Sequence, residues 1–372
     1  MLKKKDTQRL LKIIFNKQLG RENNLDLNNT ILNHPLRNQA VAQLVFIDGV
    51  YAPEFSKSAN LVGLAIVADW KTALLDYAHL IPDSVEEVEE GFFCYLTEKA
   101  QVSQLVHFLF ICTENAVARN RSLKFNNLII AKLSSNAKIF VEYLGFGEKQ
   151  YELNSTSKIY LENNAQVSYY NLQNNNLNSI YKATLEVKQS AASKFSNNHF
   201  VFGSALAEEN LNIKLQGEGA LCNLYSLSLV NGKRDSKWAL EIEHLVPKAE
   251  SHTLHKSIIT DQAHAGFRGK IKIAPQAQQS IAHLKNHNLL LSDDASVDSA
   301  PELEIYADDV KCTHGSTVGC LDEKSLFYLR ARGIPDKTAK EMLLQAFMQE
   351  MLDKIENETL REYVGDCIIR NT

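Results

Sequence analysis

The feature that most constrains the fold is a repeat of 27 to 29 residues through the middle of the chain. From residue 125 onward, short β-rich segments alternate with small polar turns. An alanine marks each turn, at Ala137, Ala165, Ala192, Ala220, Ala249 and Ala277. A fixed period in this range is typical of stacked repeats, in which each unit buries its apolar face against its neighbours.

The repeat unit predicts a β-solenoid rather than a helical repeat. No helix-length pattern lies within a unit, and a small alanine lets one turn stack closely on the next. A strand precedes each turn, at Leu128–Ala131, Lys158–Leu161, Thr184–Val187, Ile213–Leu215, Glu241–Val246 and Ile271–Ile273.

The expected architecture is mainly β and has three parts. Residues 1–124 are predicted to form a mixed, partly helical region, with a short helix over Asp6–Gln18 and a buried strand over Leu105–Cys112. Residues 125–320 form the solenoid. Residues 321–372 form a helical domain, in which Asp322 caps a helix that ends near Gly333. Two further helices are expected at about Pro335–Met351 and Glu358–Ile369.

Composition excludes several classes of protein. Lys and Arg number 40 and Asp and Glu 44, so the formal charge of −4 provides no strong field for nucleic acid or an anionic membrane. No apolar stretch approaches the roughly 20 residues of a membrane helix. The charged start argues against a signal peptide. The six cysteines form no Cys-x-x-Cys pair, which favours reduced thiols and a cytoplasmic location.

Motif searches favour a protein that is not itself an enzyme. The chain has no phosphate loop, and the nearest segment, Gly266–Ile271, is too short and ends in a residue without a hydroxyl. Common hydrolase, metalloprotease and dinucleotide signatures are absent. A β-helix enzyme, such as a polysaccharide lyase or an acyltransferase, is a rival. It needs clustered acids or bases on the solenoid wall.

Cys312 and His314 are the strongest candidate for chemistry. They are two residues apart, so on a strand they point to the same face. Thiolate and imidazole are ligands for iron or zinc, but two ligands do not complete a site. The alternative is a buried cysteine beside a hydrogen-bonded histidine.

Other histidines could form a ladder, because residues one rung apart are neighbours in a solenoid. The cluster consists of His244, His252, His255 and His264, with His283 and His287 one rung later. Solvent-facing or packed histidines are the favoured interpretation.

The helix at about Pro335–Met351 carries apolar residues at helical spacing, including Met342, Leu343, Phe347 and Met351. It can pack on the end of the solenoid, or it can dock a partner, since methionine adapts to a groove. The spacing of the apolar residues does not distinguish packing on the solenoid from docking a partner.

One block resembles a known family. Glu304–Gly319, which contains Cys312-Thr-His-Gly-Ser-Thr-Val-Gly319, is followed by Leu326–Gly333. Together they closely resemble the SufD members of the SufB/SufD family of iron–sulfur cluster assembly proteins. Phe46–Gly49 and Asn210–Ala220 also fit the family. SufB members carry Glu-His-Glu-Ala where this chain has Thr-His-Gly-Ser, so the SufD branch is the better match.

The resemblance implies a right-handed parallel β-helix and a set of partners. A SufB-like paralogue pairs through the β-helix, and a SufC-like ABC ATPase docks on the C-terminal helix that carries Met342, Leu343, Phe347 and Met351. A homodimer is one possible state of the chain without these partners.

The resemblance also implies the cofactors. A transient iron–sulfur cluster forms at the SufB–SufD interface, with His314 and Cys312 as candidate ligands. ATP-Mg is bound through SufC, reduced flavin is associated with the complex, and this chain alone holds no tightly bound cofactor. The alternative function is a purely structural homodimeric subunit without a metal role.

Overall fold

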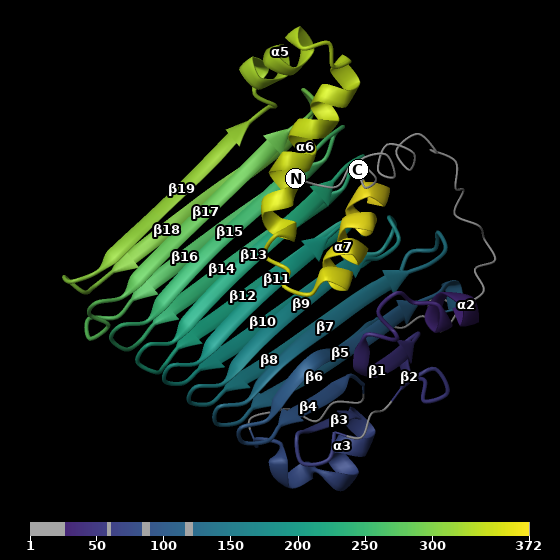
Figure 1. Cartoon of the computed structure of the whole chain (residues 1–372), viewed down its shortest axis with the longest axis vertical. Helices are drawn as coiled ribbons and strands as arrows, with labels where there is room; N and C mark the ends of the chain where they lie inside the picture. The colour runs from purple at the N-terminus through teal and green to yellow at the C-terminus, as the bar shows by residue number, and fades with distance from the viewer. Residues whose placement is uncertain (1–26, 58–60, 84–89, 116–121, 372) are drawn as a thin grey trace.

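The computed structural model describes residues 27–57, 61–83, 90–115 and 122–371, so the helix expected over Asp6–Gln18 lies outside the described residues. The chain winds between two largely parallel sheets, one strand in each per turn, which confirms the mainly β solenoid (Figure 1). Sheet A contains, in spatial order, β19 (Lys311–Gly319), β17 (Ile281–Leu290), β15 (Glu250–Ile259), β13 (Leu221–Val230), β11 (Lys194–Val201), β9 (Gln166–Asn174), β7 (Asn136–Gly145), β5 (Gln101–Cys112), β1 (Ala40–Ile47) and β2 (Val50–Tyr51).

The second sheet faces the first across the interior. Sheet B contains, in the same order, β18 (Ser296–Ile305), β16 (His264–Ile273), β14 (Asp235–His244), β12 (Leu206–Leu215), β10 (Ile180–Gln189), β8 (Glu152–Leu161), β6 (Leu123–Ala131), β4 (Phe92–Leu96) and β3 (Ala65–Asp69). Strands β1, β4 and β5 already belong to these sheets. The region predicted over residues 1–124 therefore shares its described strands with the solenoid.

Each turn before strands β5 to β17 of sheet A follows one backbone rule. A residue with positive φ precedes a small buried residue that stacks on its equivalent in the next turn. The small residues are Ala100, Ser135, Ala165, Ser193, Ala220, Ala249 and Ser280. Ala165, Ala220 and Ala249 were predicted at this position. Ala192 instead occupies the exposed positive-φ position, and Ala137 lies within β7, because serine is small enough to replace alanine in the row.

The interior contains a polar seam as well as an apolar core. Near the N-terminal end the interior is aromatic, with Phe110 stacked on Phe46 and Tyr143. Further along, polar side chains follow one another in contact. Glu209 pairs with His199 at 3.3 Å, and His255 contacts Ser226 at 2.6 Å and Ser257 at 3.0 Å. Buried Asn286 and Asn288 continue the seam toward the C-terminal end.

The helices lie at the ends and on the outer face of sheet A. Helices α6 (Asp336–Leu352) and α7 (Glu358–Asn371) cover its central strands (Figure 1). Lys256 of β15, which is 4% exposed, donates to the Phe347 carbonyl at 2.8 Å and thereby fixes α6. The remaining helices are α2 (Leu27–Leu32), α3 (Trp70–Asp76), the 3-10 helix η1 (Ala78–Leu80) and α5 (Glu323–Ala331).

The C-terminal helices form as their sequence signals predicted. The Asp322 carboxylate accepts from the Ser325 backbone N–H at 2.8 Å and so caps α5. Gly333 follows the helix with φ of +82°, the left-handed conformation that ends helices. Among the helices of the described ranges, none has the length and apolar content that crossing a membrane requires.

Candidate functional site

The last rung of the solenoid, β18 and β19, forms an open end. In the described part of the chain, β19 pairs with β17 and β18 with β16, and neither has a strand on its other side. All of β19 is exposed except half-buried Cys312. An unpaired edge presents backbone N–H and C=O groups that can template pairing with another chain.

Both predicted ligand residues lie on the inward-facing row of β19. Cys312 is in register with Ala282 and His314 with Leu284, and both of these residues are fully buried inside the solenoid. The side chains of Cys312 and His314 therefore project over the end of the core, with Cα atoms roughly 6.5 Å apart. No further rung covers them in the described structure, so a second molecule can reach both.

Burial raises the pKa of the Cys312 thiol, and a hydrogen bond with the Ala282 backbone opposes that effect. A metal ion binding there must displace the thiol proton. The other cysteines do not join this site. Cys94, Cys112, Cys222 and Cys367 are buried elsewhere, and Cys320 is exposed just beyond β19.

Three side chains that sequence reasoning missed form a polar layer beneath the open end. The hydroxyl oxygens of Ser316 and Ser299 are 2.7 Å apart, and Ser299 donates to Asn286 Oδ1 at 2.7 Å. The layer joins β17, β18 and β19. Ser and Asn carry no motif, and only the rung register brings these positions together.

Exposed apolar side chains lie along the last rung. Val318, Ile305 and Tyr306 are 52%, 41% and 59% exposed. Beyond β19, α5 projects past the stack (Figure 1), and its residues Phe327 and Tyr328 are exposed. These side chains are available for contact with a partner.

The four residues predicted to dock an ATPase have different surroundings. Met351 is fully buried against sheet A. Phe347 packs on the same cluster, with Lys256 Nζ 4.4 Å from its ring centre. Leu343 is half-buried and Met342 is 42% exposed. Packing on the chain's own sheet thus accounts for much of the amphipathic pattern. Met342 is the most exposed of the four residues and so the most accessible to a partner.

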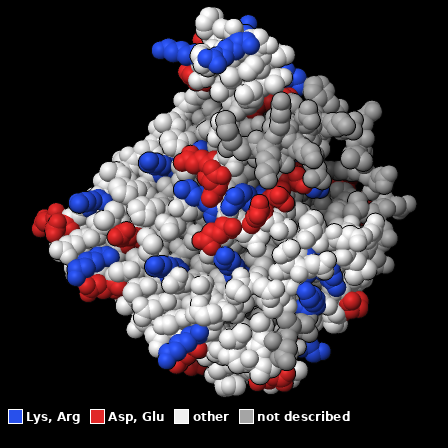
Figure 2. Space-filling view, viewed as in Figure 1, with Lys and Arg blue, Asp and Glu red and all other residues white. Residues whose placement is uncertain are grey.

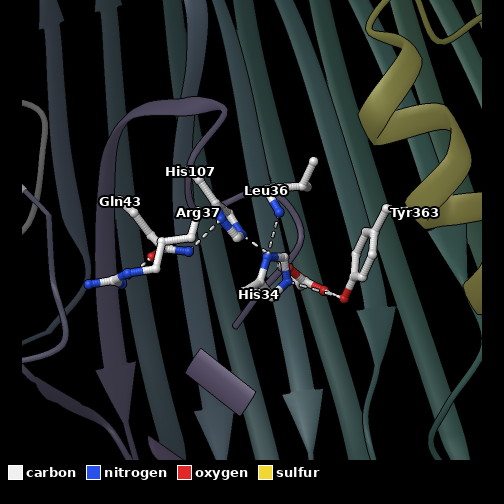
Figure 3. A network of polar contacts seen from close by, with 7 residues as sticks. His34, Leu36, Arg37, Gln43, His107 and Tyr363 are labelled. Atoms are coloured by element: carbon white, nitrogen blue, oxygen red, sulfur yellow. Dashed lines mark hydrogen bonds and ion pairs between the residues drawn. The ribbon is translucent and has the colours of Figure 1, made fainter. Parts of the chain in front are cut away.

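A second cluster with ligand chemistry lies beside α7 (Figure 3), and its residues on β5 and β7 are separated from the edge strand β19 by β9, β11, β13, β15 and β17. Ligand atoms of His34, His107 and Glu142 all lie within 4.8 Å of one another, and all three residues are buried. Both histidine Nε2 atoms are 3.0 Å from Glu142 Oε2. Tyr363 of α7 donates to the other carboxylate oxygen.

The hydrogen bonds in this cluster favour a structural role over metal binding. The Leu36 backbone N–H donates to His34 Nδ1, so the ring proton must sit on Nε2 and point at Glu142. Arg37 donates to Gln43 Oε1, which turns the Gln43 amide N–H groups toward His107 Nδ1. His107 therefore also carries its proton on Nε2. Burial raises the pKa of Glu142, but the attraction of His34 and the hydrogen bonds from His107 and His34 outweigh burial and hold that pKa well below the usual range.

The remaining histidines are mostly packed or solvent-facing. Burial lowers the pKa of His244 to about 4 and that of His255 to about 3. His264 lies between Asp235 and Asp298 on the outside of sheet B. Of the six histidines considered for a ladder, His252 and His283 lie in register and their rings stack.

Among the described residues on the face that carries α6 and α7, charge does not gather into a single patch. Figure 2 shows acidic and basic side chains interspersed there. This agrees with the formal net charge of −4.

Comparison with known proteins identifies the family. Residues 113–347 match the SufBD core domain of the SUF system for FeS cluster assembly. The chain is 28% identical to an iron–sulfur cluster assembly SufBD family protein of Synechocystis, over 88% of this chain and 77% of that protein. It is also 28% identical to the SufD protein of Escherichia coli, over 87% and 77%. With Bacillus subtilis SufD the identity is 25%, over 76% and 64%. The domain match spans more than half of the chain, which therefore belongs to the SufBD family of iron–sulfur cluster assembly proteins and is SufD-like.

Proposed function

We propose that this chain is the SufD-type, non-ATPase subunit of a SUF scaffold and pairs with a SufB-like paralogue through its open end. The observation that carries the proposal is the unpaired rung β18–β19, with Cys312 and His314 facing out over the core. A related solenoid can continue both sheets by edge-to-edge pairing. The apolar rim of Val318, Ile305 and Tyr306 adds area that such a partner can bury.

In this assembly the iron–sulfur cluster is cargo and not a resident group. His314 offers a nitrogen lone pair to iron at the interface, and Cys312 offers a thiol close by. The partner supplies further thiolates. A site with few ligands from each subunit suits a scaffold, because the finished cluster must leave.

The ATPase partner is proposed to bind the C-terminal helices. The chain lacks a phosphate loop, so ATP-Mg enters through a SufC-like subunit. Phe327, Tyr328 and Met342 are exposed on α5 and α6 and provide apolar contact area. Because Lys256 ties α6 to β15, movement of the docked ATPases can reach the β-solenoid. Binding of reduced flavin by the complex stays a prediction.

The test is anaerobic co-expression with SufB-like and SufC-like partners, followed by purification through a tag on this chain. Iron, sulfide and the visible spectrum are measured for the wild type, His314→Ala and Cys312→Ala. Cys320→Ala is the matched control, because Cys320 is exposed just beyond β19. We expect an intact complex in every case and loss of cluster only in the first two variants.

The same experiment separates the alternatives. Equal cluster content in wild type and His314→Ala would support a purely structural subunit, homodimeric when alone. Failure to form any complex would contradict the proposed pairing and reopen the β-helix enzyme hypothesis.

A further inference from the structure

Two histidines lie side by side on the outer face of sheet A, next to the open end. His252 of β15 and His283 of β17 are in register, and their ring centres are 5.3 Å apart with planes inclined by 24°. The next residue in the row is Thr313 of β19. The pair is therefore one strand away from the unpaired edge.

This pair differs from the ion pairs that join neighbouring strands on sheet B. There, in-register outward-facing residues combine opposite charges, such as Glu208 with Lys237 at 3.5 Å and Lys214 with Glu243 at 3.0 Å. Opposite charges across strands stabilise a sheet. Two imidazoles gain no such attraction, but they bring two nitrogen ligands together on adjacent strands.

Neighbouring side chains prepare the pair for a cation. His283 Nδ1 is 2.7 Å from the Thr313 hydroxyl oxygen. If Nδ1 carries the proton and donates it there, Nε2 keeps a free lone pair, which is how an outer hydrogen bond orients a metal-binding histidine. Glu250 Oε2 is 3.6 Å from His252 Nε2. The side chains of His252 and Glu250 are 37% and 45% exposed, so solvent ions reach them.

We propose that His252 and His283 together bind one divalent first-row transition-metal ion, with the Glu250 carboxylate beside His252. Imidazole suits iron, cobalt, nickel, copper and zinc, and a nearby carboxylate offsets the positive charge. Thr313 holds the His283 ring. Water completes the coordination, because the site faces solvent.

In the setting of the proposed function the ion is ferrous iron, held beside the rung that carries His314. His314 follows Thr313 in sequence and lies on the opposite face of β19. The assignment of this ion as iron for cluster assembly rests on the proposed function. The binding of a divalent ion by the two histidines does not.

The test uses the full-length chain in a Cys312→Ala/His314→Ala background, so that the open end does not contribute ligands. Co²⁺ is the probe, titrated calorimetrically into the parent and into His252→Ala, His283→Ala and Thr313→Val. His287→Ala is the matched control. His287 lies on the same strand and has the same 2.7 Å contact with a threonine, but its in-register neighbour is Lys256. Far-UV circular dichroism confirms that each variant is folded.

We expect one equivalent of Co²⁺ in the parent and the control. We expect at least tenfold weaker binding in both histidine variants, and weaker binding in Thr313→Val. No binding by the parent would overturn the proposal. So would an affinity within twofold of the parent in His252→Ala or His283→Ala, or an equal loss in His287→Ala.

A second arm separates this inference from the proposed function. Anaerobic Fe²⁺ loading of the SUF complex is compared between His283→Ala and His287→Ala, with His314 intact. Slower loading in His283→Ala alone supports the iron-supply role. Equal loading overturns that role, while the Co²⁺ result still decides whether the metal site exists.

Discussion

The two ends of the solenoid are built differently. At the N-terminal end, both sheets finish in short antiparallel strands, with β2 on β1 and β3 on β4. The interior there is filled by aromatic rings such as Phe46, Phe92 and Phe110, all fully buried. At the C-terminal end the sheets stop at parallel strands, and the inward-facing row is exposed.

The difference separates a capped end from an open end, which we propose is an interface. Stacked repeats need a special terminal unit, because each unit otherwise leaves an apolar face and unpaired backbone groups uncovered. Among the residues that the structure describes, such a unit closes the N-terminal end, and no strand covers β18 and β19. The predictions below compare the two ends, from the largest expected effect on the free energy of unfolding to the smallest.

The aromatic cap should be the most sensitive to truncation. Phe110 is fully buried among Phe46, Phe125 and Tyr143. Phe110→Ala removes a ring and leaves a cavity, so we expect a loss of about 3–5 kcal/mol in the free energy of unfolding. Urea denaturation measures this. A loss below about 1 kcal/mol would mean that the cap does not stabilise the stack.

The Glu142 cluster should fix α7 to the capped half of the molecule. Glu142→Gln removes the carboxylate that receives donors from His34, His107 and Tyr363, and it buries an amide against them. We expect a loss of about 3 kcal/mol and faster hydrogen exchange in residues 358–371.

Tyr363→Phe is the milder companion variant. It removes one hydrogen bond to a charged group and should cost about 1.5–3 kcal/mol. Unchanged exchange of α7 in both variants would contradict the anchoring role of the cluster.

Interior histidines should make stability depend on pH. Burial lowers the pKa of His255 to about 3, below the unfolded value of 6.5. Between these values the unfolded chain binds a proton that the folded chain does not, so stability falls as pH falls. His255→Asn should reduce that slope by up to about 1.4 kcal/mol per pH unit. Chemical denaturation between pH 4 and 7 measures the slope, and an unchanged slope in His255→Asn would contradict this role of the buried imidazole.

A substitution at the open end should leave the stability of the isolated chain nearly unchanged but weaken the complex. Val318 is 52% exposed on β19, so Val318→Asp should alter the free energy of unfolding by no more than about 0.5 kcal/mol. The same variant places a charge in the proposed SufB-like interface, and we expect at least tenfold less partner to co-purify. If Val318→Asp and the wild type co-purify equal amounts of partner, β19 is not part of the interface.

The sequence predicted the repeat and the helix caps, because each depends on local chemistry. The prediction that an alanine marks each turn was partly wrong, because Ser193 and Ser280 occupy the small buried position in two of the turns. The Glu142 cluster could not be predicted. Its hydrogen bond between Tyr363 and Glu142 spans 221 residues, and no period or motif links the two. The pairing of His252 with His283 required the exact register of two strands.

The polar seam inside the solenoid has a thermal consequence. On unfolding, apolar surface raises the heat capacity and polar surface lowers it. A core that holds Glu209, His199, Asn286 and Asn288 among its buried side chains exposes more polar surface than an all-apolar stack. The heat capacity of unfolding should therefore lie below the usual value of about 12–15 cal/mol/K per residue. The stability curve of this protein should then be broad and flat with temperature.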